Sequence, residues 1–175
     1  LPLTLFPYTT LFRSLSAHLQ AAAGARGTGT LVWRAAPTGV AGNQISGTTL
    51  HSLLRLPINK DFKPLSAIDK AQLQKKLKDI RYLIIDEKSM LGLRQLSWID
   101  DRLREAFPDR NDEFFGGLSI LLVDDFFQLP PVLQKPLYYD KEVQGVEIKG
   151  RNAYRRFDKT VVLKVVQRQR GEDQG

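Results

Sequence analysis

The sequence contains no cysteine, one methionine and two histidines among its 175 residues. The absence of cysteine excludes disulfides and thiolate metal sites. No apolar run approaches the roughly 18 uninterrupted residues that a membrane-spanning helix needs. The remaining composition, 42% hydrophobic and 26% charged, is ordinary for a globular protein, and the length suits one domain with a sizeable core.

Acidic residues are outnumbered: the sequence has 19 of them and 26 lysines and arginines, which gives a net charge of +7. The sequence pI is near 9.7. Such a balance suits a polyanionic partner such as nucleic acid. Many basic proteins bind no nucleic acid, however, and the cluster "KKLK" at 75–78 also fits a solvated helix face.

Apolar runs at residues 30–36, 81–87 and 118–125 predict strands that are buried on both faces, because their hydrophobic residues are continuous and do not alternate. Helical spacing predicts a helix between each pair of strands. The first covers 66–80 with Ser66 as its N-cap, and the second ends at Pro108. Their apolar positions are Ile68, Leu73, Leu77 and Ile80 in the first, and Leu96, Ile99, Leu103 and Phe107 in the second. This order predicts an α/β domain with a parallel sheet flanked by helices.

The remaining segments carry weaker patterns. Residues 15–23 predict a helix that leads through a turn at 24–30 into the first strand. Residues 159–166 favour one more strand. The stretch 134–156 lacks a clear period and is interpreted as loops with a short hairpin.

Acidic and amide side chains follow two of the predicted strands, where ligands bind in open parallel sheets. Asp86 and Glu87 end the second run, and Asp125 and Gln128 follow the third. A carboxylate pair at this place can hold magnesium and deprotonate an attacking water, as nucleotide hydrolysis requires. Taken alone, the same residues also fit an acidic strand-to-loop turn and a polar loop.

Four segments in order resemble motifs of the petite-integration-frequency (Pif) family of DNA helicases, including the helicases of Helitron transposons. They are "APTGVAGNQISGTTLHSLL" at 36–54, "YLIIDEKSM" at 82–90, "DDFFQLPPV" at 124–132 and "VVQRQRGED" at 165–173. The resemblance runs from Leu15 to Asp173, which is nearly the whole chain. It implies a RecA-like P-loop NTPase motor domain that uses ATP and Mg2+ to move 5′ to 3′ along single-stranded DNA.

The resemblance also implies roles for individual residues. Asp86 corresponds to the metal-associated carboxylate and Glu87 to the general base, while Gln128 corresponds to the gamma-phosphate sensor, with Asp125 beside it. Arg168 corresponds to the arginine that touches the terminal phosphate, where a fixed positive charge stabilises the transition state.

A second set of residues resembles the family segments that hold the DNA strand. Short hydroxyl side chains and backbone N–H groups at the start of a helix suit phosphate oxygens. For the one histidine of the set, packing within a helix is an equally weighted alternative. The residues are Pro37, Thr38, Gly39, Thr49, His51 and Ser52.

The sequence departs from the family by lacking any G-x-x-x-x-G-K-[ST] loop. The run "GARGTGT" at 24–30 has no Lys-Ser/Thr ending and precedes a strand, so it is rejected as a phosphate loop. The family loop would stand just upstream of Leu15, where "TLFPYTTLFRS" resembles the translation of a sequencing-adapter oligonucleotide. We therefore expect residues 1–14 to be non-native and 15–175 to be an incomplete first motor domain. Native coding sequence upstream of Leu15 tests this expectation.

Asp124 is a further departure, because the family usually has glycine there and an added carboxylate would repel ATP. Two alternatives to a helicase follow. One is a non-catalytic, single-stranded-DNA-binding remnant of a decayed transposon, and the other is an ATPase with a non-DNA substrate. Family resemblance further implies a nuclear or mitochondrial location and roles in DNA repair, DNA recombination or telomere maintenance.

Overall fold

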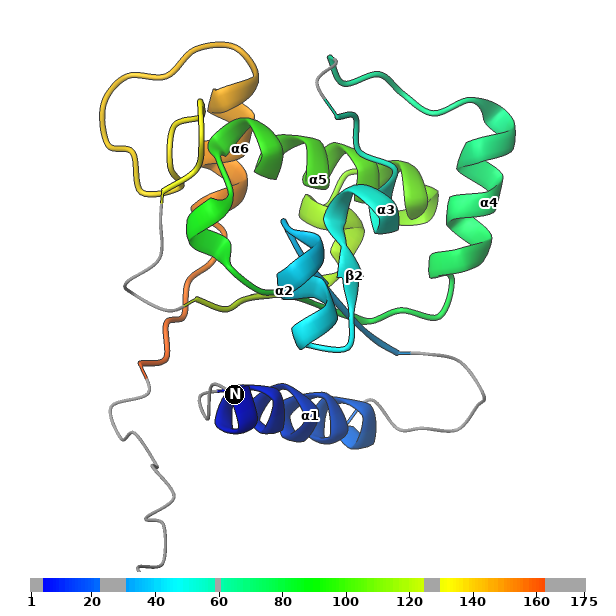
Figure 1. The fold of residues 1–175 in the computed structure, drawn as a ribbon. Helices are drawn as coiled ribbons and strands as arrows, with labels where there is room; N and C mark the ends of the chain where they lie inside the picture. The colour runs from blue at the N-terminus through cyan, green and yellow to red at the C-terminus, as the bar shows by residue number, and fades with distance from the viewer. Residues whose placement is uncertain (1–4, 23–30, 59–60, 125–129, 163–175) are drawn as a thin grey trace, which may run out of the picture.

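The structure, a computed structural model, describes residues 5–22, 31–58, 61–124 and 130–162. Its centre is a parallel sheet in the order β2-β1-β3-β4 (Figure 1). The predicted α/β architecture with a parallel sheet is therefore confirmed. The strands are β1 Val32–Ala36, β2 Thr48–Thr49, β3 Tyr82–Ile85 and β4 Ser119–Leu122.

The middle of the sheet is buried on both faces, as continuous apolar runs require. Ala35, Leu83, Ile84 and Ile85 are fully buried. Ala35 and Leu83 belong to the larger apolar core, whereas Ile84 faces a smaller cluster on the opposite side. The strand β2, which the sequence patterns did not predict, adds a short parallel edge beside β1.

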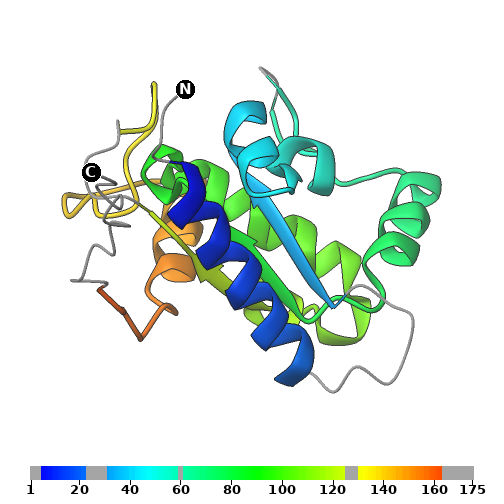
Figure 2. The same cartoon turned by 60° about the horizontal axis from the view of Figure 1, so that its bottom comes forward.

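Helices cover both faces of the sheet. Figures 1 and 2 show α1 alone on one face, with its N-terminal end near the carboxyl ends of the strands, and the other long helices opposite. No helix within the described segments is both long and apolar enough to cross a bilayer. The helices are α1 Leu5–Ala22, α2 Gly39–Gln44, α3 Leu50–Leu54, α4 Ala67–Leu77, α5 Leu93–Ala106 and α6 Val146–Tyr154, and short 3-10 turns are η1 Lys88–Met90, η2 Pro108–Arg110 and η3 Phe114–Gly117.

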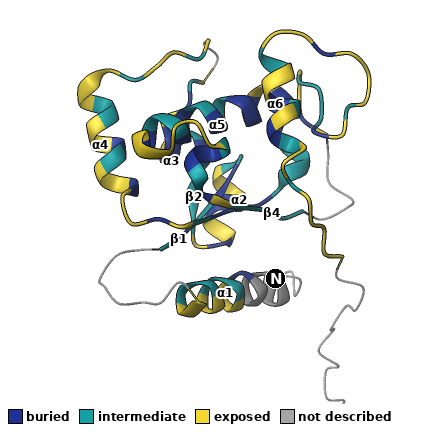
Figure 3. Ribbon diagram, turned by 180° about the vertical axis from the view of Figure 1, so that it is seen from behind, coloured by how far each residue is buried: buried dark blue, intermediate teal, exposed yellow. Residues whose placement is uncertain are grey.

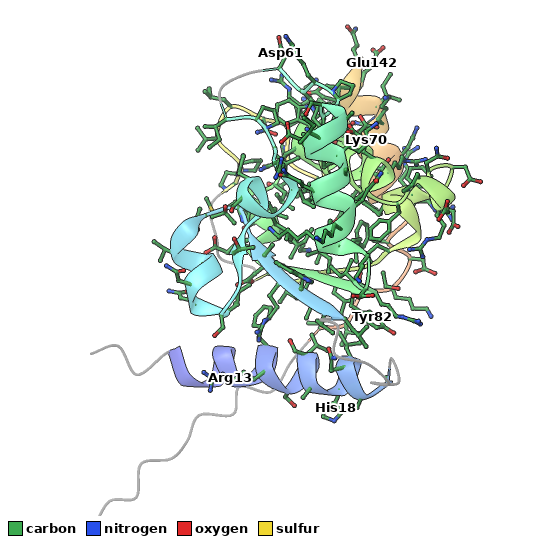
Figure 4. All side chains as sticks on the ribbon, turned by 90° about the vertical axis from the view of Figure 1, so that its right-hand side faces the viewer. Arg13, His18, Asp61, Lys70, Tyr82 and Glu142 are labelled. Carbon is green, nitrogen blue, oxygen red and sulfur yellow. The ribbon has the colours of Figure 1, made fainter. Side chains whose placement is uncertain are left out.

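Helix α1 extends further toward the N-terminus than the expected 15–23 helix, because it begins at Leu5. Phe12 is buried and packs in the smaller cluster with Val32 and Ile84. His18 points away from the sheet (Figure 4), and its ring Nδ1 lies 2.8 Å from the Ser14 carbonyl oxygen. The non-native origin of residues 1–14 stays a prediction.

The two helices predicted between the strands are confirmed. Ser66 caps α4 by accepting a hydrogen bond from the Asp69 N–H, at 3.1 Å. Ile68 is 73% exposed, so its assignment to the apolar stripe of α4 was wrong. Figure 3 shows α5 largely buried between the sheet and its neighbours, whereas α4 turns a broad exposed face to solvent.

Arg102 fastens the loop after α3 to α5, although its side chain is only 2% exposed. The guanidinium pairs with Glu105 at 3.1 Å and donates to the carbonyls of Arg55 and Lys63. A buried guanidinium is tolerated where its charge is paired and most of its N–H groups find acceptors, although the buried Nε of Arg102 has no hydrogen-bond partner among the described residues. Arg102 therefore holds an irregular segment in place.

The prediction of loops and a short hairpin at 134–156 was wrong for Val146–Tyr154, which form α6, whereas residues 134–145 form loops as predicted. The buried positions of α6 are Gly150 and Ala153, which carry almost no apolar side chain. A helix that packs through small residues shows no hydrophobic period, which explains why the sequence patterns did not predict α6. Of the strand favoured at 159–166, the described residues 159–162 form no strand, and the rest lies outside the described residues.

Substitution of Gly150 by alanine should destabilise the protein. A Cβ at this position would lie 1.8 Å from the Leu93 carbonyl oxygen, so α6 and α5 must move apart. We expect Gly150→Ala to lower the free energy of unfolding by about 1–3 kcal/mol through overpacking, despite the better helix propensity of alanine. Chemical denaturation measures this change.

The matched control is Asn152→Ala at an exposed position of α6, where we expect unchanged or slightly higher stability. Equal stability of the two variants would contradict the close packing.

Candidate functional site

The candidate site lies where the parallel strands end together. Pro37, Thr38 and Gly39 follow β1, whereas Thr49 ends β2. Asp86 and Glu87 follow β3, and Asp124 comes two residues after β4. Because all four strands point the same way, these residues gather at one edge of the sheet. This is the edge at which open α/β sheets bind ligands.

Asp86 is held rigidly at the end of β3. Its backbone N–H donates to the Ala35 carbonyl oxygen at 2.9 Å, which continues the ladder between β3 and β1. Its carboxylate accepts a hydrogen bond from the Glu87 N–H at 2.8 Å. The residue is 1% exposed, so this carboxylate is one of the few buried acidic groups of the described chain. A fixed carboxylate of this kind suits a hard cation such as magnesium.

Glu87 leaves the strand in an unusual backbone conformation. Its φ of 52° and ψ of 47° are left-handed, which costs a non-glycine residue roughly 1–2 kcal/mol. The Glu87 Oε2 atom accepts a hydrogen bond from the Thr38 hydroxyl at 3.2 Å. This contact joins a residue expected at the DNA strand to the residue expected to activate water.

The pKa of Glu87 is raised above its ordinary value, chiefly because burial disfavours the charged form. The hydrogen bond from Thr38 opposes the shift by stabilising the carboxylate. The negative charges of Asp86 and Asp124 raise the pKa further. A raised pKa makes Glu87 a better proton acceptor whenever it is ionised.

Asp124 brings a third carboxylate to the edge. Its Oδ1 atom is buried and makes no hydrogen bond with any described residue. The neighbouring backbone is fixed, because the Lys88 N–H donates to the Val123 carbonyl oxygen at 3.1 Å. A buried carboxylate oxygen without a hydrogen-bond donor is costly unless something outside the described chain satisfies it.

The described residues by themselves do not form a complete metal cage. No group of three or more histidine or acidic side chains among them is placed to hold a metal ion. Magnesium in nucleotide enzymes is held by one or two carboxylates together with phosphate oxygens and water, so the arrangement of Asp86 and Glu87 fits such an ion.

The residues expected to contact DNA include two helix caps on neighbouring strands. The Thr38 hydroxyl accepts from the Ala41 N–H at 3.3 Å and caps α2. The Thr49 hydroxyl accepts from the N–H of Ser52 at 3.1 Å and caps α3. Since Ala36 pairs with Thr49 in the sheet, the two caps lie at the same edge.

The other expected contact residues surround these caps. Gly39 and Ser52 are exposed, while Pro37 and His51 are half-buried. Burial lowers the pKa of His51, which favours its neutral ring. This is compatible with packing in α3 and with contact to a DNA strand.

Three predicted site residues lie outside the described residues: Asp125, Gln128 and Arg168. Their relation to Glu87 stays a prediction. Conversely, the sequence reasoning missed the hydrogen bond between Thr38 and Glu87. The signal available was the strand order, because β1 and β3 are neighbours and both residues follow these strands closely.

Comparison with known proteins agrees with the motifs. The family model described as PIF1-like helicase matches residues 8–175. The ATP-dependent DNA helicase PIF1 of Candida albicans is 34% identical over 148 residues, covering 78% of this chain but 16% of the relative. The ATP-dependent DNA helicase RRM3 of Saccharomyces cerevisiae is 42% identical over 108 residues, covering 57% of this chain and 14% of the relative.

Solved structures show the same similarity in three dimensions. Unliganded Pif1 from Bacteroides sp. superposes with a TM-score of 0.56 at 34% identity, covering 73% of this chain and 27% of that one. The Bacteroides Pif1 complex with ADP-AlF3 and single-stranded DNA gives a TM-score of 0.53 at 33% identity, covering 73% and 28%. The described sheet and helices thus match part of a Pif1 motor domain, and this chain belongs to the PIF1-like helicase family.

Proposed function

We propose that this chain forms part of the first motor domain of an ATP-dependent helicase that moves 5′ to 3′ along single-stranded DNA. The observation that carries the proposal is the pair of Asp86 and Glu87 at the carboxyl edge, with Glu87 hydrogen-bonded to Thr38 from a DNA-contact motif. The related Bacteroides Pif1 has been solved with ADP-AlF3 and single-stranded DNA together, which supports both ligands for the family.

In this proposal Asp86 and Glu87 have different roles in ATP hydrolysis. Asp86 would hold magnesium, directly or through water, because its backbone N–H is bonded to the Ala35 carbonyl oxygen and its carboxylate is held by the Glu87 N–H. Bound magnesium neutralises charge on the nucleotide phosphates. Glu87 orients the attacking water and accepts its proton, a task that its raised pKa suits.

Residues outside the described segments complete the assignment. We propose that Gln128 senses the terminal phosphate beside Asp125, and that Arg168 stabilises the transition state with its fixed positive charge. The DNA strand passes Pro37, Thr38, Gly39, Thr49, His51 and Ser52. Nuclear location, the mitochondrial alternative, and roles in DNA repair, recombination or telomere maintenance are proposals that rest on family membership alone.

The phosphate loop must come from sequence that these 175 residues do not contain, because no G-x-x-x-x-G-K-[ST] occurs in them. We propose that it precedes Leu15 in the native gene. Asp124, whose negative charge adds to the acidic edge and would repel nucleotide phosphates, favours the second candidate, a DNA-binding remnant without turnover. Salt-sensitive DNA binding with no ATPase activity in the native full-length protein would support the remnant.

The proposed function is tested by Glu87→Gln in the full-length protein encoded by the native gene. Loss of the general base should lower ATP turnover at saturating single-stranded DNA by about 100-fold or more, because glutamine cannot accept the proton. Steady-state phosphate release measures this turnover. Glu142→Gln removes the same charge from an exposed loop far from the strand ends and should turn over as the wild type does (Figure 4). Full activity in Glu87→Gln would exclude the assigned base.

A further prediction concerns Asp124, whose negative charge raises the pKa of Glu87. Asp124→Gly should increase ATP turnover at neutral pH, since it removes repulsion toward phosphates. Because turnover requires ionised Glu87, it falls as the pH drops through the Glu87 pKa. Removing Asp124 lowers that pKa and should move the acid limb of the pH–rate profile to lower pH. Asp158→Gly, at an exposed position outside the site, should leave the profile unmoved. A profile of Asp124→Gly identical to wild type would remove Asp124 from the site.

A further inference from the structure

The Thr38 hydroxyl makes two hydrogen bonds that use it in opposite senses. Its oxygen accepts from the Ala41 N–H at 3.3 Å, and its proton goes to Glu87 Oε2 at 3.2 Å. A hydroxyl has a single proton, so it can donate to one strong acceptor at a time. The proton on Thr38 is therefore committed to Glu87 in this structure.

The fold places this hydroxyl beside Glu87 through backbone constraints on both partners. Ala35 pairs with Ile85, and the ladder continues to the Asp86 N–H. Beyond this point the chains diverge: Thr38 starts α2, and Glu87 turns in its left-handed conformation. The Asp86 carboxylate fixes the Glu87 backbone from the other side. The contact between Thr38 and Glu87 thus bridges two segments that leave adjacent strands.

We propose that Thr38 is a positioning residue that restrains Glu87 while no DNA is bound and releases it when a DNA phosphate takes the Thr38 proton. This inference rests on the proposed function, which places the DNA strand at Thr38 and the attacking water at Glu87. The phosphate and the Glu87 carboxylate are both anionic acceptors, and they compete for one donor.

Release would free the carboxylate of the base. Glu87 regains rotamer freedom to reach water, because the hydrogen bond from the Thr38 hydroxyl no longer holds its Oε2 atom. This freedom accelerates hydrolysis only when DNA is present. Such competition for one proton gives DNA-stimulated ATP turnover without any large movement of the sheet.

The direct test is the ATP turnover of Thr38→Val in the full-length native protein, with and without oligothymidylate. Valine has nearly the shape of threonine and no donor, so turnover without DNA should rise by about 10-fold, and stimulation by DNA should shrink correspondingly. Thr38→Ser keeps the donor and should restore the wild-type pattern. If the role of Thr38 were purely structural, Thr38→Val would lower ATP turnover without changing the ratio of turnover with DNA to turnover without DNA.

Ser66→Ala provides the matched control. The Ser66 hydroxyl also caps a helix and donates to a carboxylate, at 2.7 Å to Asp69 Oδ2, but it precedes α4, away from the strand ends. Its loss should leave turnover without DNA and the stimulation ratio unchanged. An increase in Ser66→Ala equal to that in Thr38→Val would overturn the inference.

A second test needs no nucleotide and still applies if Thr38→Val turns over poorly. If the Glu87 carboxylate and a DNA phosphate compete for the Thr38 proton, a weaker acceptor at position 87 must strengthen DNA binding at Thr38. Glu87→Gln should therefore tighten binding of fluorescent oligothymidylate by about 5-fold, a gain that vanishes in the Thr38→Val background. Asp124→Asn removes a nearby charge without touching the hydrogen bond. The inference is overturned if Asp124→Asn increases the DNA affinity as much as Glu87→Gln does. It is also overturned if the gain from Glu87→Gln persists in the Thr38→Val background, because the effect would then come from the loss of negative charge alone.

The two sets of results separate the inference from the proposed function. If Glu87→Gln is inactive while Thr38→Val has the wild-type rate without DNA and the wild-type stimulation, the base assignment stands and the inference fails. If Glu87→Gln retains full activity, the proposed function itself fails, whatever the DNA-binding result.

Discussion

The parallel alignment of β1 with β3 is the constraint on which the candidate site depends. Ala35 pairs with Ile85, and the next hydrogen bond runs from the Asp86 N–H to the Ala35 carbonyl oxygen. A slip of one residue would turn the side chains of β3 to the opposite faces and would move Asp86 away from its present place at the edge. The fully buried side chains of Leu83, Ile84 and Ile85 oppose such a slip, because they fill the core on both faces. Packing deep in the sheet therefore fixes chemistry at its edge.

The electrostatics of this edge are strongly one-sided. Asp86, Glu87 and Asp124 bring three carboxylates together, and the charges of Asp86 and Asp124 both raise the pKa of Glu87. The three carboxylates repel one another, and the same negative potential favours the binding of a positively charged group at this edge. Magnesium, the lysine of a phosphate loop and Arg168 would each supply such charge in the proposed motor. The positive net charge of the chain as a whole therefore does not describe this acidic edge.

How much was predictable from the sequence varies with the range of the interaction. The runs that became β1, β3 and β4 and the periodic helices α4 and α5 were predicted, because local periodicity reports burial directly. Helix α6 was missed since its buried positions are Gly150 and Ala153, which produce no hydrophobic period. The placement of Asp86 and Glu87 at the edge was predicted because they directly follow an apolar run in a sheet expected to be parallel. The hydrogen bond between Thr38 and Glu87 joins residues 49 positions apart, and only the neighbouring order of β1 and β3 could have indicated it.

The side-chain type at Thr38 fits its two tasks better than the usual capping alternatives. Aspartate caps a helix well but has no proton to donate, and it would repel Glu87. Asparagine donates through an amide whose geometry differs from that of a hydroxyl. Serine has the donor but rotates more readily, whereas the β-branch of threonine restricts χ1 and keeps the hydroxyl between Ala41 and Glu87. A cap that shares its proton with the Glu87 carboxylate links the start of α2 to the end of β3, and in the proposed motor a ligand at one of these places would change the chemistry at the other.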